Sequence, residues 1–472
     1  MIKLIWNDIK KMRKRRKTLV YTDLLFFLCV LPFSVLLSFL DRSTEYKNLI
    51  LILTSLLIFS WGKPFGVCLL FLTSVTEWMI SKWIEKNKKE QKNNFLPLFI
   101  DVLINLSVFF VFTENFLYIG NDVFNIGKSL ASIGIFFYII RGISYVYDVF
   151  KGKIKAEKNV FCVLTYMCAY FFMPVGPVVR YGEIEPYIRN RKLSLDGMTN
   201  GLNSFIYGLG KAVIIAPVLR KIGEAGLRLE DIIGCWTGSV CMLGFAYFLF
   251  TGFCDMSWGL SKIYGFEFKK NYQSLGIAGV YKGVIKSCAT SLYEFFEEVI
   301  SDLPIKYKSL AIVILSVLTA FMFNQSLLFL IIGIIIGLVI ILEKTTLNKK
   351  LEKMPSWIKF FWTYAISFLL LGGLFSDGFK DWAKWFSGLF GISNKYTLSV
   401  AVKYALINNI FIVIIAFLII LAPLRKKIIR KTEVYSEASA ENYGKISIIK
   451  TIITALIFIA CIIVITSTNI QI

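Results

Sequence analysis

Residues 250–296 have the sequence FTGFCDMSWGLSKIYGFEFKKNYQSLGIAGVYKGVIKSCATSLYEFF, and this stretch decides how the chain is organised. It is the longest central segment that is too polar to lie wholly within a bilayer core, because it combines Asp255, a basic and aromatic run, and the small residues 287–291. Apolar runs flank it on both sides. A polar insert between such runs is where recognition or chemistry is expected in a membrane protein.

The rest of the composition predicts a membrane protein. The chain has 472 residues, of which 56% are hydrophobic, and its mean hydropathy is +0.66. This apolar share exceeds the usual range of about 45–50% in soluble domains. It is gathered in continuous runs without the alternation of a membrane barrel strand. We therefore predict an all-α polytopic integral membrane protein, a bundle of about eleven to thirteen transmembrane or part-spanning helices of roughly 20 residues each.

The chain divides into a basic N-terminal segment, residues 1–20, and one transmembrane domain, residues 21–472. The apolar run that starts at Tyr21 is too long for a signal-peptide core and lacks a small-residue cleavage site, so it is predicted to be a span. Another apolar stretch, Phe205 to Leu219, carries Lys211. No soluble domain and no internal repeat is evident.

The formal net charge of +22 is explained by basic loops between spans, which follow the positive-inside bias and attract anionic lipid. We expect membrane lipid as a partner and no nucleic acid, since no nucleic-acid motif is present. The nine cysteines include no CxxC pair, so neither a disulfide framework nor a metal site is predicted. The chain has no histidine at all, which excludes imidazole as a base, metal ligand or pH switch.

Several polar residues are candidates for chemistry. A carboxylate at membrane depth is costly, so Asp255 is a functional candidate, although a helix-terminal or interfacial charge is an equal interpretation. Glu294 and Glu298 share a helical face, for which a solvated surface is favoured over a cation site. Cys288 and Ser291 are nucleophile types, but without histidine a group such as Glu294 would have to activate them.

Arg180 follows the sequence Pro-Val-Gly-Pro at residues 174–177. Two prolines around a glycine break a helix and free backbone groups, which at membrane depth must face protein or a wet cavity. A helix end with a cluster of interfacial charges is favoured over a substrate site at this position.

Four segments together carry a family resemblance: SWGKP at Ser60–Pro64, SIGIFFYIIRGISYVYDVFKGKI at Ser132–Ile154, VGPVVRY at Val175–Tyr181, and the residues from Gly252 to Asn271. From about Tyr21 to about Gly391 the chain resembles the membrane-bound O-acyltransferases. Within that family it is most similar to the branch of alginate O-acetyltransferases and D-alanyl-lipoteichoic acid transfer proteins. The resemblance implies the family's helical bundle, with a core at about residues 129–345.

The two histidines of the family are replaced. Counting without gaps from Asn271, one family histidine falls on Ala289 and the other on Phe323, while Ser291 keeps its register. In family terms the histidine is the base that acts on the acceptor hydroxyl. Neither alanine nor phenylalanine accepts a proton, and losing a general base typically costs about 10²–10⁴-fold in rate.

The resemblance implies a multi-pass protein of the bacterial plasma membrane that takes part in O-acylation, of acetyl or D-alanyl type, of a cell-envelope polysaccharide or polymer. It implies no bound cofactor, an acyl donor such as acyl-CoA or an acyl carrier protein, and an extracytoplasmic acyl-transfer partner. Histidine-based catalysis is expected to be lost or strongly reduced. The first alternative is an inactive relative that serves as scaffold, partner subunit or lipid and glycan conduit. The second is a transporter, which the lack of repeated halves disfavours. The candidate tunnel or substrate-path residues are Asp255, Asn271, Cys288, Ser291, Glu294, Asn324 and Arg180.

Overall fold

A computed structural model describes residues 22–40, 43–60, 64–112, 126–172, 177–227, 232–272, 289–323, 327–345, 347–355, 379–391, 400–429 and 440–468, with a few single positions between 286 and 368. Every regular element in these ranges is a helix, which confirms the predicted all-α class. In chain order the elements are η1 (Phe26–Val30), α2 (Leu31–Leu40), α3 (Thr44–Ser60), α4 (Pro64–Lys89), α5 (Phe95–Phe112), α6 (Ile126–Lys151), α7 (Val160–Cys168), η2 (Tyr170–Phe172), α8 (Tyr181–Arg189), α9 (Leu195–Gly210), η3 (Lys211–Ile215), α10 (Ala216–Leu227), α11 (Ile232–Ile263), α13 (Thr290–Ser301), α14 (Ile305–Phe323), α15 (Leu327–Lys344), α16 (Asn348–Lys353), α18 (Phe379–Leu389), α19 (Val400–Asn408), α20 (Ile410–Ile429) and α21 (Ala440–Thr468).

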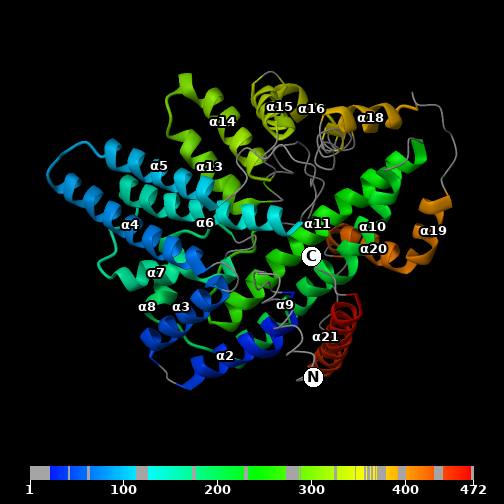
Figure 1. Ribbon diagram of the computed structural model, residues 1–472, viewed down its shortest axis with the longest axis horizontal. Coiled ribbons are helices and arrows are strands. Elements are labelled where there is room, and N and C mark those ends of the chain that lie inside the picture. The colour runs from blue at the N-terminus through cyan, green and yellow to red at the C-terminus, as the bar shows by residue number, and fades with distance from the viewer. Residues whose placement is uncertain are drawn as a thin grey trace.

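The long helices α9 and α11 pass through the middle of the molecule (Figure 1). The blue to cyan helices α2 to α8 lie on one side of them, and the orange to red helices α18 to α21 lie on the other. The main hydrophobic core joins η1, α4, α6, α7, α9 and α11. Its buried tyrosines 145, 166 and 181 meet edge to face, an arrangement that adds about 0.5–1.5 kcal/mol per pair beyond area burial.

Close backbone contact joins α9 to α11. A Cβ atom built on Gly201 would lie 2.5 Å from the carbonyl oxygen of Gly259, and one on Gly208 would lie 2.5 Å from that of Gly252. Only glycine fits at such distances, which is how small residues let membrane helices pack closely. We call this contact, made by the glycine pairs 201–259 and 208–252, the α9–α11 seam.

The helix that starts at α9 continues without a break into α10. Its middle is the π-helical turn η3, where each residue bonds one position further along than in an α-helix. The α10 half also packs on α11, where a Cβ on Gly226 would lie 2.7 Å from the Cα of Gly238. Both halves of one long helix therefore contact α11.

Among the described residues, four helices are long and apolar enough to cross a bilayer, namely Leu195–Leu227, Ile232–Ile263, Leu327–Lys344 and Lys450–Ser467. A fifth crossing is possible in length and composition if the helices Val402–Asn408 and Ile410–Ile420, which meet at 75°, form one broken span. These helices agree with the predicted membrane protein. The expected eleven to thirteen crossings are not confirmed, and the count stays a prediction.

Replacing Gly208 by Val tests the α9–α11 seam. The branched side chain would press on the Gly252 carbonyl, so we expect a loss of about 1–3 kcal/mol from overpacking. The measurement is thermal unfolding of the purified protein in one detergent, followed by circular dichroism. Gly244→Ala is the matched control, because its Cβ would meet only the end of the flexible Leu219 side chain, at 3.0 Å. Equal melting temperatures for both variants would contradict the seam.

Candidate functional site

Asp255 lies within α11, well before that helix ends at Ile263, and only 4% of the residue is exposed. The ammonium group of Lys211 donates to its Oδ2 at 2.6 Å, and that of Lys270 donates to its Oδ1 at 2.6 Å. The hydroxyl of Tyr272 lies 2.9 Å from both oxygens. Asp255 is therefore the centre of a buried ion cluster, and the interpretation as a helix-terminal charge is wrong. We call these four residues the Asp255 cluster.

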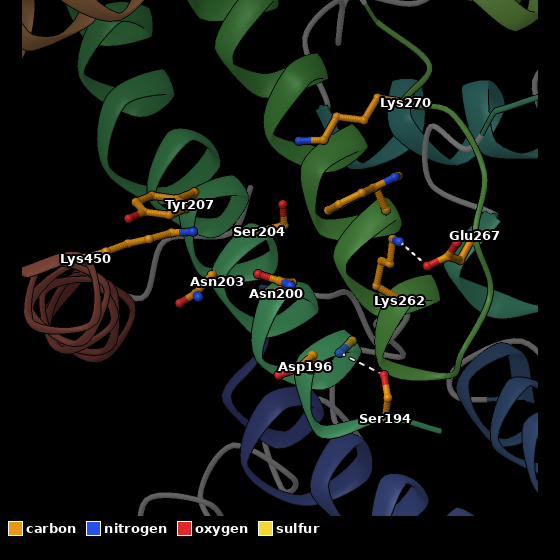
Figure 2. Close-up of a pocket in the computed structure, with 12 residues that line it drawn as sticks. Ser194, Asp196, Asn200, Asn203, Ser204, Tyr207, Lys262, Glu267, Lys270 and Lys450 are labelled. Carbon is orange, nitrogen blue, oxygen red and sulfur yellow. Dashed lines mark hydrogen bonds and ion pairs between the residues drawn. The ribbon is translucent and has the colours of Figure 1, made fainter. Parts of the chain in front are cut away.

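A tight turn after α11 brings the chain back to this cluster. Gly265 has a φ of 76°, a conformation that disfavours any residue with a side chain, and a Cβ there would lie 2.8 Å from the Lys192 carbonyl oxygen. After the turn the chain runs back beside α11, as Figure 2 shows for the segment from Glu267 to Lys270. Lys270 and Tyr272 thereby reach Asp255.

The Asp255 cluster leaves no carboxylate oxygen free for proton transfer. Two ammonium groups and one carboxylate give it a net positive charge, and Tyr272 adds hydrogen bonds without charge. Burial and the neighbouring carboxylate raise the pKa of the Tyr272 hydroxyl well above its usual value, so this group stays protonated and donates to Asp255. The arrangement ties α9 and the segment after α11 to α11.

Asn271 and Ser291, both candidates for the substrate path, lie together. The Ser291 hydroxyl donates to Asn271 Oδ1 at 2.6 Å and accepts from the Val178 backbone N–H at 2.8 Å. The Thr290 N–H donates to the Asn271 carbonyl oxygen at 2.8 Å. These bonds fix the start of α13 against both the end of the signature stretch and the segment that leads into α8.

Ala289 occupies the N-cap position of α13, directly before Thr290. It makes no side-chain capping bond, and it packs against the main hydrophobic core. The position on which the ungapped count predicts the first family histidine is therefore held at the start of α13, and its side chain is a methyl group.

Arg180 is the N-cap residue of α8, which agrees with the predicted helix end and its cluster of charges, and its side chain joins that helix to α6 and α13. Its guanidinium binds Asp148 of α6 at 2.7 Å and Glu298 of α13 at 2.7 Å, and it lies over the ring of Phe295 at 4.7 Å. Lys153 completes the network on Glu298 at 2.6 Å. These partners account for the charge of Arg180 within the protein itself.

A polar pocket of about 430 Å³ opens between α9, α11 and α21. Figure 2 shows Asn200, Asn203, Ser204 and Tyr207 along α9, with Lys450 of α21 beside them. Figure 2 shows Lys262 of α11, Glu267 and Lys270 on the facing wall, and Trp258 of α11 also lines the pocket. Because Lys270 also binds Asp255, the pocket and the Asp255 cluster share a wall.

Comparison with known proteins finds relatives that match about a third of the chain. The chain is 31% identical over 156 residues to a probable alginate O-acetylase AlgI of Pseudomonas fluorescens, a match that covers 33% of this chain and 32% of the relative. The AlgI of Pseudomonas aeruginosa is 29% identical over 155 residues, 32% of this chain and 30% of that protein. Over about a third of its length the chain is thus a homologue of proteins named probable alginate O-acetylase.

A more distant match is a peptidoglycan O-acetyltransferase of Helicobacter pylori, 24% identical over 215 residues, which covers 38% of this chain and 41% of that protein. The chain spans about a third of the length of the curated AlgI relatives that it matches. No family model matches the chain.

The remaining predicted site residues lie in different parts of the structure. The Glu294 side chain is 60% exposed and its nearest cation, Lys286, is 4.0 Å away, so it lies on a solvated face as expected. Glu298, predicted to share that face, is instead bound by Arg180. Cys288 and Asn324 lie outside the described residues, as does most of the Pro-Val-Gly-Pro sequence. Phe323 ends α14, and its side chain is outside the description.

One buried cluster escaped the sequence analysis of this homologue altogether. Glu77 of α4 and Asp101 and Asn105 of α5 are each 1% exposed, and Asn105 Nδ2 donates to Glu77 Oε1 at 2.7 Å. Carboxyl groups inside apolar runs were the signal that would have found it.

The polar side chains of α9 were missed as well. The sequence analysis identified only the apolar part of this helix, from Phe205 onward. The polar residues before Phe205 were therefore not recognised as one face of the same helix. Their periodicity would have identified them.

Removing the carboxylate of the Asp255 cluster tests its role. Asp255→Ala would leave the largely buried Lys211 and the partly exposed Lys270 without their carboxylate, so we expect the variant to lose about 3–5 kcal/mol of stability or to fail to accumulate in membranes. Glu224→Ala, which removes a partly exposed pair with Arg220, is the control and should change stability by less than about 1 kcal/mol. The measurement is the melting temperature in detergent together with the membrane yield. A stable Asp255→Ala protein would show that the cluster is not structural.

Proposed function

We propose that this chain is a multi-pass protein of the bacterial plasma membrane that takes part in O-acylation, of acetyl or D-alanyl type, of a cell-envelope polysaccharide or polymer, with histidine-based catalysis lost or strongly reduced. The names of its relatives, alginate O-acetylase and peptidoglycan O-acetyltransferase, support the substrate class. The acyl donor in this proposal is acyl-CoA or an acyl carrier protein, and an extracytoplasmic acyl-transfer protein is the partner.

The observation that carries the proposal is the start of α13. Asn271, Thr290 and Ser291 hold this helix terminus in place, and Ala289 stands there without an ionisable group. The hydrogen bonds around position 289 are formed, but the side chain at that position cannot act as a base. Since no histidine exists anywhere in the chain, no neighbouring imidazole can replace it.

Neither carboxylate considered as a substitute is suited to the task. Both oxygens of Asp255 accept bonds from an ammonium group and from Tyr272, and Glu294 lies on an exposed face. A general base must have a free lone pair within hydrogen-bond reach of the acceptor hydroxyl. This occupation of Asp255 supports the alternative role of an inactive scaffold, partner subunit or lipid and glycan conduit.

Restoring the two histidines tests the proposal. We expect the unmodified protein in lipid nanodiscs to transfer acetyl groups from labelled acetyl-CoA or a labelled acyl carrier protein to an envelope polymer at background rate. The double variant Ala289→His and Phe323→His should raise the rate by about 10²-fold or more, because it returns a general base to the family position. The measurement is the label recovered in the polymer fraction.

The matched control carries the first histidine one turn along α13, as Tyr293→His with Phe323→His, and should stay at background. Retained melting temperatures would show that each variant is folded. Robust transfer by the unmodified protein would overturn the loss of catalysis while leaving the O-acylation role in place.

A further inference from the structure

One face of α9 carries a polar stripe through a helix that is otherwise apolar enough to span a membrane. Its members recur every three or four residues, so they share one side of the helix. They are Asp196, Asn200, Asn203, Ser204, Tyr207 and, at the next turn, Lys211. Polar side chains within a span mark a substrate path or a polar cavity by default, and all but Lys211 line the pocket of Figure 2.

The polar groups on the pocket wall that faces the stripe already have hydrogen-bond or ion-pair partners within the protein. Lys262 binds Glu267 at 2.6 Å, Lys270 binds Asp255 at 2.6 Å, and the indole N–H of Trp258 donates to the Phe268 carbonyl oxygen at 2.9 Å. Both ammonium groups also lie over the Trp258 ring, at 5.4 and 4.7 Å from its centroid. This wall gives the pocket its shape, and its charges are already paired.

The stripe, in contrast, has hydrogen-bond donors and acceptors that have no partner among the described residues. Within the described part of the chain, the side chains of Asn200, Asn203 and Ser204 form no hydrogen bond, and those of Asp196 and Lys450 form no ion pair. The pocket thus offers amide and hydroxyl groups that both donate and accept, one carboxylate that accepts, and one unpaired cation.

These groups favour a hydroxyl-rich ligand over a phosphate. A phosphate presents only acceptors and about two negative charges, and it would meet one unpaired ammonium group in a pocket that also contains the Asp196 carboxylate. The ring hydroxyls of a sugar donate and accept together, as amide side chains require. Lys450 would in addition suit a sugar that carries a carboxylate. The volume lies within the range of ordinary small-molecule sites, roughly 300–1,000 Å³.

We propose that the pocket between α9, α11 and α21 binds a sugar unit of the polymer that this protein serves, through Asn200, Asn203 and Ser204. The choice of that polymer rests on the proposed function. The site itself rests on the stripe and the pocket. The shared wall at Lys270 places the sugar beside the Asp255 cluster.

Binding is tested on the full chain in lipid nanodiscs by equilibrium dialysis, without an acyl donor. The sugar probes are a labelled alginate tetrasaccharide and a labelled disaccharide of N-acetylglucosamine and N-acetylmuramic acid. The phosphate probes are inorganic phosphate and coenzyme A. We expect at least one sugar to bind and neither phosphate probe to compete. The double variant Asn203→Ala and Ser204→Ala should weaken sugar binding about tenfold or more, since it removes two sets of hydrogen bonds.

Asn200→Ala provides a second variant at an exposed position, where misfolding is not expected, and should weaken binding severalfold. The matched control is Thr199→Ala, an exposed residue of the same helix whose hydroxyl bonds to the Leu195 carbonyl oxygen and which does not line the pocket. It should bind as the unmodified protein does.

Absence of sugar binding, competition by coenzyme A or phosphate, or equal binding by all variants would overturn the site. Because this assay needs no acyl transfer, its failure is distinguishable from failure of the proposed function. Transfer by the histidine-restored protein combined with no sugar binding would reject only the pocket.

Discussion

The contact that the rest of the structure depends on is the backbone approach of α9 to α11. Glycine pairs at 201 with 259 and at 208 with 252 allow the two helices to meet with no side chain between them. This approach holds Lys211 within 2.6 Å of Asp255 and sets the polar face of α9 opposite Trp258. The ion cluster and the pocket are therefore consequences of one helix packing, and a wider separation would remove both.

Several candidate site residues hold helices together. Asn271, Ser291 and Arg180 each form hydrogen bonds or ion pairs that join segments distant in sequence, and these contacts stabilise the packing of those segments. What a hydroxyl acylation needs in addition is one group able to accept a proton. The methyl group of Ala289 packs against the core, whereas backbone and amide hydrogen bonds hold the start of α13, so this helix terminus does not depend on the side chain at position 289.

Much of the fold could be predicted from sequence because apolar runs and helical periodicity are local properties. Asp255 was identifiable because a carboxylate in an apolar run is unusual, yet its partners were not, since Lys211 is 44 positions away and faces it only through helix packing. Glu294 and Glu298 show what helical periodicity cannot predict. It places both residues on one face of a helix, but only the tertiary structure shows that Arg180 binds Glu298. Asp196 to Ser204 were overlooked because the apolar residues that follow them were taken to begin the helix.

The π-helical turn η3 has a consequence for how this protein tolerates changes in length. A π turn holds one residue more than an α turn, so the helix halves before and after Lys211–Ile215 are rotated relative to a regular helix. Deleting one residue there would restore α geometry and leave α10 in its orientation, whereas deleting one residue from the first turn of α10 would turn the rest of α10 by about 100° relative to α9. Gly226 would then leave its contact with Gly238, while the stripe on α9 stayed in place. The π turn thus accommodates one extra residue while both halves of the helix stay against α11, and its first residue, Lys211, adds the ion pair with Asp255.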